Sequence, residues 1–218
     1  VEENKEKGYE FKTDSDTEVL LTYYEYKGKE AVKDFRGMFA FIIFDEKDNT
    51  IFGARDHFGI KPLYYIDEED YIAFSSEYKC LINLLKDKSI NKKSLQSYMS
   101  FQYVLPNDTM LNKIKSVPAG SYFTIIDGKL EFERYNEFNL KSTKHVTSND
   151  IKNVVVDSVK KHMIANVEVG TFLSGGIDST IVAAIASKIN PKIKTFSVGF
   201  DVDGYSELEV AQKTAKCL

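Results

Sequence analysis

The chain has 218 residues, of which 43% are hydrophobic and 28% charged, and its formal net charge is −4. These values are typical of a soluble globular protein with one large or two modest domains, and the negative charge without a basic stripe argues against a nucleic-acid partner. The longest apolar run, residues 38–44, is too short to cross a membrane, and no signal peptide is visible at the N-terminus.

The first two thirds of the chain alternate short apolar runs with polar turns. A helix is predicted over residues 17–26. The run 38–44 is apolar at every position, so we expect a strand that is covered on both faces and that forms a hairpin with 50–55. A further strand pair is expected at 63–66 and 71–75. Short strands with polar turns predict an antiparallel sheet.

Charged residues fill the segment between these strand pairs. Arg55, Asp56 and His57 are consecutive, which raises the alternatives of a catalytic triad or a metal site. His57 has no second histidine nearby, so we favour a charged turn that fixes one strand to the next. Cys80 and Cys217 lie far apart, which favours incidental thiols in a reducing cytoplasm over a disulfide or a metal site.

The last third of the chain has a different pattern. The polar stretch 139–148 is the predicted domain boundary, and a helix is expected over 149–163. An apolar strand, 167–173, is followed by a glycine turn and a helical segment from 180, and a second strand at 193–200 completes a βαβ unit. The chain is expected to be a segment of a larger enzyme, because its last residues resemble an unfinished helix.

The glycine turn carries the most specific motif, Ser-Gly-Gly-Ile-Asp-Ser at residues 174–179. A turn between a strand and a helix directs free backbone N–H groups and the positive end of the helix at an anion such as phosphate. Glycines let the backbone come close to the anion. Asp178 would repel phosphate unless a cation such as Mg²⁺ lay between them. The next lysine is Lys188, so the motif is not a Walker P-loop.

This motif resembles the pyrophosphate loop of ATP-dependent adenylating enzymes, SGGxDS. The resemblance implies that the loop holds the pyrophosphate of ATP and that Asp178 is a Mg²⁺ ligand. It implies that the tips of the two strands line the site for the adenine or the intermediate. The residues implied to bind ATP or pyrophosphate are Phe172, Leu173, Ser174, Gly175, Gly176, Asp178, Ser179, Val198 and Gly199.

Further segments resemble one family in the same order. Residues 37–41, 55–65, 75–79 and 114–120 look like parts of a class II glutamine amidotransferase domain, and with the pyrophosphate loop they resemble glutamine-hydrolysing asparagine synthetases. The implied fold class is α+β followed by α/β. Part of an N-terminal-nucleophile hydrolase αββα sandwich would occupy residues 1–140. The start of a parallel-sheet adenine-nucleotide domain, the ATP-dependent asparagine synthetase domain, would occupy 148–218.

The resemblance also implies a reaction. Such a carbon–nitrogen ligase makes asparagine from aspartate, ATP and glutamine through a β-aspartyl-adenylate that glutamine-derived ammonia attacks. In the segment 13–18, Asp16 matches the family aspartate that holds the glutamine α-amino group, while Ser15 or Asp16 is also a suitable helix N-cap. A cytoplasmic location is expected, and a homodimer is one assembly that the resemblance allows.

Some family features have no counterpart in this sequence. The family nucleophile is an N-terminal cysteine, which we expect upstream of Val1, so no catalytic residue is assigned in this segment. We expect the aspartate pocket beyond Leu218, and the isolated chain to be inactive. Two alternatives stay open: another adenylating amidotransferase with a different carboxylate acceptor, and a non-catalytic binding module.

Overall fold

The computed structural model describes residues 9–13, 15–136, 145–200 and 206–218. The chain divides into two units, Val1–Leu140 and Lys141–Leu218. None of the helices in these described ranges is long and apolar enough to span a membrane.

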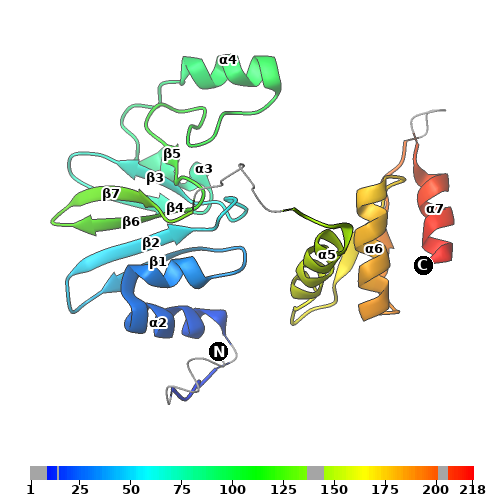
Figure 1. Ribbon diagram of the computed structural model, residues 1–218. Coiled ribbons are helices and arrows are strands. Elements are labelled where there is room, and N and C mark those ends of the chain that lie inside the picture. The colour runs from blue at the N-terminus through cyan, green and yellow to red at the C-terminus, as the bar shows by residue number, and fades with distance from the viewer. Residues whose placement is uncertain (1–8, 14, 137–144, 201–205) are drawn as a thin grey trace. The chain divides into compact units, whose positions relative to one another are not determined.

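A four-stranded antiparallel sheet with the order β1-β2-β6-β7 forms one layer of the first unit (Figure 1). The elements of this layer and of the helical layer beside it are α2 (Asp16–Lys27), η1 (Gly28–Asp34), β1 (Ala40–Asp45), β2 (Thr50–Arg55), β6 (Ser121–Ile126) and β7 (Lys129–Arg134). The predicted hairpin is confirmed, because β1 pairs with β2 from Ala40 opposite Arg55 to Asp45 opposite Thr50.

A second antiparallel sheet, with the order β4-β3-β5, forms the next layer of this unit. Its strands and the helices that follow them in the chain are β3 (Tyr64–Asp67), β4 (Ile72–Ser75), α3 (Tyr78–Leu81), η2 (Ile82–Leu84), α4 (Lys92–Phe101) and β5 (Lys115–Ser116). The second predicted strand pair is confirmed by the pairing of Tyr64 with Ser75.

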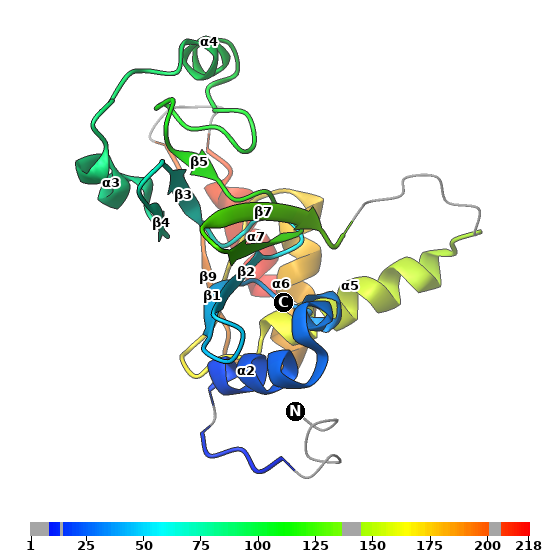
Figure 2. The ribbon, with the colours of Figure 1, turned by 90° about the vertical axis from the view of Figure 1, so that its left-hand side faces the viewer.

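Alternate residues of the central strands pack into different hydrophobic clusters. In β2, Phe52 packs toward α2 and η1, whereas Ile51 packs toward the second sheet. In β3, Tyr65 packs toward the first sheet, whereas Ile66 packs toward α3. Because side chains alternate across a strand, this pattern gives the layer order helix, sheet, sheet, helix. Both views of the ribbon place α2 and α4 at opposite ends of the unit (Figure 1, Figure 2).

The apolar run at β1 is covered less completely than its sequence predicts. Phe41 and Ile43 pack toward α2 and η1, as expected. On the other face only Ala40 joins the cluster between the sheets, and Ile42 and Phe44 are exposed. The prediction of a strand covered on both faces is therefore wrong for these two side chains, because β1 lies at the edge of its sheet.

Arg55 and Asp56 join the two sheets at the end of β2. The Arg55 guanidinium donates hydrogen bonds to Ser116 Oγ of β5 and to the Val117 carbonyl oxygen, both at 2.6 Å. The Asp56 side chain, only 1% exposed, accepts hydrogen bonds from the backbone N–H groups of Ile60 and Lys61 at 2.9 Å. The interpretation of this segment as a structural turn is confirmed.

The second unit contains a short parallel strand pair. Its elements are α5 (Ser148–His162), β8 (Gly170–Phe172), α6 (Ile177–Ile189), β9 (Lys194–Phe196) and α7 (Leu208–Cys217). Strands β8 and β9 pair in parallel, with Phe172 opposite Phe196, so β8, α6 and β9 form a βαβ unit. Both strands are shorter than the runs predicted from sequence.

Capping and packing place the helices of this unit. The side chains of Thr147 and Asp150 form a capping box at the start of α5. Leu173, Ala183 and Ala211 form a buried cluster that joins the end of β8 to α6 and α7. The turn after β8 is therefore held between two helices.

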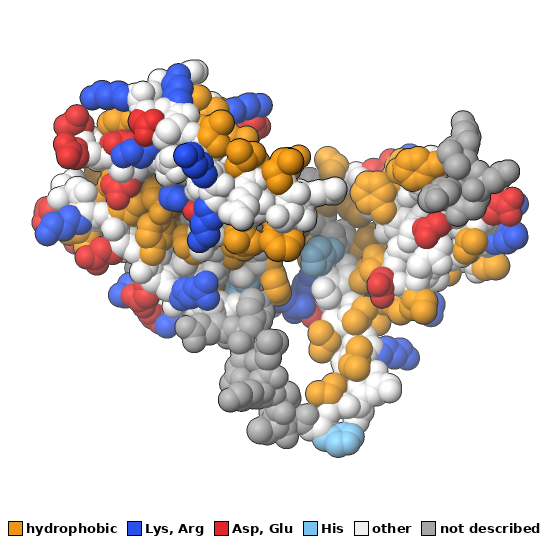
Figure 3. All heavy atoms as spheres, turned by 90° about the horizontal axis from the view of Figure 1, so that it is seen from above, with side chains coloured by type: hydrophobic (Ala, Val, Ile, Leu, Met, Phe, Trp, Pro, Cys, Tyr) orange, Lys and Arg blue, Asp and Glu red, His pale blue; other side chains and the backbone are white. Residues whose placement is uncertain are grey.

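Positive and negative side chains alternate on the visible surface. On the face in Figure 3, lysine and arginine side chains are interspersed with aspartate and glutamate. This mixture is typical of a solvated protein surface.

We expect Asp56→Asn to destabilise the first unit by about 2 kcal/mol, because the amide loses charge-assisted hydrogen bonds and brings N–H donors toward backbone N–H groups. Burial raises the pKa of Asp56. The hydrogen bonds from the backbone N–H groups of Lys61, Ile60 and Phe58 lower the pKa by more than burial raises it, so the net pKa lies below the usual value. The stabilisation is therefore complete above the unfolded pKa, about 3.9, and is lost as pH falls through the folded pKa.

Urea unfolding followed by circular dichroism at pH 7 and near pH 3 measures this loss. Asp70→Asn, at an exposed position, is the matched control. Equal stability of Asp56→Asn and the control at pH 7 contradicts the prediction.

Candidate functional site

The turn between β8 and α6 brings three backbone N–H groups together at the start of a helix. The Ser174 N–H donates to Ser179 Oγ at 3.1 Å, and the Gly176 N–H donates to Ser174 Oγ at 3.2 Å. The Gly175 N–H donates to Glu207 Oε2 at 3.2 Å. The two serine hydroxyls also hydrogen-bond to each other, with 2.8 Å between their oxygens. The turn is thus closed by its own serines and by one carboxylate.

The glycine at 175 provides room for a neighbouring helix. A Cβ atom at this position would lie 3.2 Å from Val210 Cγ1 of α7. At Gly176 the nearest atom is Ser174 Oγ, at 3.4 Å, and this glycine is the extended N-cap of α6. Close packing of the turn, rather than positive backbone φ, is therefore the structural reason for a glycine at 175.

The first turn of α6 carries Asp178 on the surface. The helix begins at Ile177, and Asp178 is the acidic residue of its first turn. The Asp178 side chain is exposed. Among the residues that the structure describes, no three His, Cys, Asp or Glu side chains gather into a metal site.

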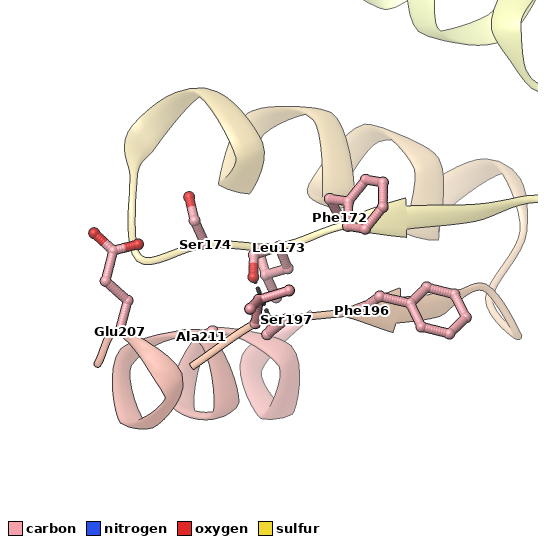
Figure 4. A pocket seen from close by; sticks show the side chains of 8 residues that line it. Phe172, Leu173, Ser174, Phe196, Ser197, Glu207 and Ala211 are labelled. Atoms are coloured by element: carbon pink, nitrogen blue, oxygen red, sulfur yellow. Dashed lines mark hydrogen bonds between the residues drawn. The ribbon is translucent and has the colours of Figure 1, made fainter. Parts of the chain in front are cut away.

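A pocket of about 220 Å³ lies beside this turn, at the carboxyl ends of β8 and β9 (Figure 4). Ligands of parallel α/β sheets bind at this edge. The Ser197 hydroxyl, at the end of β9, donates to the Leu173 carbonyl oxygen at 2.6 Å and so joins the two strand ends. The residues that line the pocket are Phe172, Leu173, Ser174, Phe196, Ser197, Val198, Glu207 and Ala211.

The predicted site residues fall into two groups. Phe172, Leu173, Ser174 and Val198 line the pocket; Leu173 is buried, whereas Phe172 and Val198 are 78% and 77% exposed. The remaining predicted residues are not among the lining side chains. Gly175, Gly176, Asp178 and Ser179 belong to the turn and the start of α6, and a Cβ at Gly199 would lie 2.2 Å from Leu208 Cδ1.

Sequence reasoning missed two polar residues of this pocket. Ser197 follows the second strand, and its place at a carboxyl end was a signal that could have identified it. Glu207 had no such signal, because its contact with Gly175 joins residues 32 positions apart in the chain. The contact depends on how α7 packs.

Asp16 lies at the start of α2 in the first unit. The N-cap is Ser15, whose side chain accepts a hydrogen bond from the Thr17 N–H at 3.2 Å. Of the two capping alternatives, the structure therefore selects Ser15, and Asp16 is an exposed residue of the first turn. Glu18 holds the preceding segment by accepting hydrogen bonds from the N–H groups of Lys12 and Thr13, at 2.8 and 2.7 Å.

Hydrogen bonds also tune the Glu18 carboxylate. The N–H of Lys12 and the hydroxyl of Thr13 are the main causes that hold the pKa of Glu18 below its usual value.

Comparisons with known proteins agree with the sequence motifs. The family model for the glutamine amidotransferase domain matches residues 1–136. The chain belongs to the glutamine amidotransferase family. In this member of the family, residues 150–218 match a second model, described as asparagine synthase.

The relatives of this amidotransferase-family chain include named synthetases. It is 47% identical to asparagine synthetase [glutamine-hydrolyzing] 1 of Bacillus subtilis, covering 100% of this chain and 35% of that protein. It is 34% identical to asparagine synthetase B [glutamine-hydrolyzing] of Escherichia coli, covering 96% of this chain and 36% of that protein. The chain thus spans about a third of the length of these curated relatives. The family resemblance predicted from the motifs is confirmed.

A solved structure of another amidotransferase has a weaker likeness. Glutamine phosphoribosylpyrophosphate amidotransferase from B. subtilis matches 90% of this chain and 42% of its own, with 19% identity and a TM-score of 0.44.

We expect Ser179→Ala to loosen the turn, because it removes the acceptor of the Ser174 N–H. Amide hydrogen exchange at Ser174 should become roughly fivefold faster, which corresponds to about 1 kcal/mol. Ser187→Ala removes a hydroxyl from the other end of α6, where it donates to the Ala184 carbonyl oxygen, and should leave Ser174 unchanged. Equal exchange at Ser174 in both variants contradicts the assigned hydrogen bond.

Proposed function

We propose that the chain contributes two consecutive parts of a glutamine-hydrolysing asparagine synthetase. Residues 1–140 would be the C-terminal part of its class II glutamine amidotransferase domain, of the N-terminal-nucleophile hydrolase type. The helix–sheet–sheet–helix order of the first unit supports this assignment. Residues 148–218 would be the N-terminal part of its ATP-dependent synthetase domain, supported by the βαβ unit and the asparagine synthase match.

The observation that carries this function is the Ser-Gly-Gly turn at the start of α6. Its three neighbouring N–H groups and two serine hydroxyls are donors suited to an anion, and the N-terminus of the 13-residue helix α6 adds a positive potential. We assign this turn to the pyrophosphate of ATP, with Ser174, Gly175, Gly176 and Ser179 as the residues that hold it. Asp178 would bind Mg²⁺ that neutralises the phosphate charge.

The neighbouring pocket supports a nucleotide beside the pyrophosphate. Phe172, Leu173 and Val198 supply apolar surface next to Ser174, which suits the adenosine part of ATP. Gly199 would line the same site from the backbone after Val198. Aspartate would react with ATP beside this pocket.

The proposed reaction needs both parts of the enzyme. A carboxylate is a poor electrophile, and an adenylate gives it a good leaving group. Ammonia released from glutamine attacks the β-aspartyl-adenylate and yields asparagine and AMP, while pyrophosphate stays on the loop. Ammonia is mostly protonated in neutral water, so it needs a route that excludes solvent. Asp16 would bind the α-amino group of glutamine, whereas a homodimer and a cytoplasmic location stay predictions.

Titration of the chain with ATP and Mg²⁺ tests the nucleotide site. We expect Asp178→Asn to weaken ATP binding in the presence of Mg²⁺ by about tenfold, because the amide is a poorer magnesium ligand than a carboxylate. Glu209→Gln removes the same charge from α7, where Glu209 is an exposed partner of Lys213, and should bind ATP as the unchanged chain does. If the unchanged chain does not bind ATP or pyrophosphate, the nucleotide assignment is wrong.

Glutamine titration tests the first unit separately. Asp16→Asn should weaken glutamine binding by about tenfold, because it removes the charge that pairs with the α-amino group. Glu25→Gln, at an exposed position of the same helix, is the control. Equal affinity of the two variants contradicts the role of Asp16.

A further inference from the structure

Glu207 places a carboxylate at the point where the proposed function places a phosphate. Its Oε2 accepts a hydrogen bond from the Gly175 N–H at 3.2 Å. Glu207 also lines the pocket beside the turn, where its side chain extends from the start of α7 toward the loop (Figure 4). The turn therefore already holds one anionic group, supplied by the chain itself.

The position of Glu207 is fixed by the packing of α7 against the turn. Ala211, one helical turn later, is buried with Leu173 and Ala183, and its N–H donates to the Glu207 carbonyl oxygen at 3.0 Å. Val210 packs beside Gly175 on the same side. Glu207 is the N-cap residue of α7, yet its side chain does not cap that helix. Instead, the side chain accepts a hydrogen bond from the turn between β8 and α6.

Glu207 differs chemically from the two other acceptors in the turn. Ser174 and Ser179 hydroxyls accept hydrogen bonds from N–H groups, but a hydroxyl can rotate and donate to an arriving phosphate oxygen. An ionised carboxylate only accepts hydrogen bonds, and it repels a phosphate at short distance. The serines can therefore stay in place when an anion binds, whereas the carboxylate has to move away.

We propose that Glu207 is an internal competitor for the anion site: its carboxylate occupies the Gly175 N–H in the ligand-free chain and is displaced when a pyrophosphate group binds. Glu207 would then lower the affinity of the loop for anions and favour release of the product. This inference rests on the assignment of the turn to pyrophosphate. It assigns to Glu207, which lies outside the Ser-Gly-Gly motif, the role of opposing pyrophosphate binding.

Three variants distinguish two effects of Glu207 on anion binding: its hydrogen bond with the Gly175 N–H, and the general repulsion between its charge and an anion. Glu207→Ala removes the carboxylate. Glu207→Asp keeps the charge on a side chain that is one methylene shorter. Glu209→Ala removes a carboxylate from the same helix at an 89% exposed side chain that has no contact with the turn among its described interactions.

Two measurements on the 218-residue chain are needed. Without ligand, amide exchange at Gly175 should be roughly fivefold faster in Glu207→Ala and Glu207→Asp, and unchanged in Glu209→Ala. Inorganic pyrophosphate with Mg²⁺ should bind about five- to tenfold more tightly to Glu207→Ala, less so to Glu207→Asp, and with little change to Glu209→Ala.

The outcomes distinguish this inference from the proposed function. Unchanged Gly175 exchange in Glu207→Ala overturns the occupation of the N–H. If Glu207→Ala and Glu209→Ala increase the affinity for pyrophosphate equally, the increase comes from the lower net negative charge alone, and the competitor role is overturned. Weaker pyrophosphate binding by Glu207→Ala makes Glu207 a ligand partner and overturns it as well. If pyrophosphate binds to none of the chains, the proposed function fails and displacement fails with it, while the exchange rate still decides whether the contact exists.

Discussion

The hydrogen bonds of Arg55 and Asp56 are the constraint on which the layered first unit depends. Arg55 ends β2 in one sheet, and its guanidinium reaches Ser116 of β5 in the other. Asp56 keeps the intervening turn closed through its side chain, and its backbone carbonyl oxygen accepts from the Gly120 N–H just before β6. Arg55 is partly buried and Asp56 is buried, and charged groups in such positions are costly unless their hydrogen bonds are satisfied. Here backbone carbonyl oxygens and Ser116 Oγ accept hydrogen bonds from Arg55. Backbone N–H groups donate to the Asp56 carboxylate, so both charged groups have their partners where the two sheets meet.

Local patterns in the sequence predicted much of this fold, and the limits have physical causes. The two hairpin-like pairs were predictable from apolar runs and polar turns. The β6–β7 hairpin was not predicted, although Asp127 and Gly128 both have positive φ in its turn, and an Asp-Gly pair between alternating apolar residues is a strong hairpin signal. Exposure of Ile42 and Phe44 was not predictable, because it depends on which strand lies at the sheet edge.

The candidate site also has a part that could be predicted from the sequence and a part that could not. The order strand, turn, helix is local, so residues 174–179 could be placed from sequence alone. The strands predicted at 167–173 and 193–200 are longer than β8 and β9, because the two strands pair only over residues 170–172 and 194–196. Glu207 lies beyond any local pattern, since its contact requires α7 to pack through the small side chain of Ala211.

The closed hydrogen bonding of the Ser-Gly-Gly turn has a consequence for the cost of binding. Each of the three N–H groups already has a partner, and the Thr180 hydroxyl donates to the Gly176 carbonyl oxygen at 2.8 Å. These hydrogen bonds hold the backbone conformation of the turn, so on the proposed function the loop is formed before an anion arrives. Association would exchange the Glu207 carboxylate for the anion at the Gly175 N–H and would lose little backbone conformational entropy. In a preorganised loop of this kind, little of the binding free energy is offset by the cost of ordering the backbone.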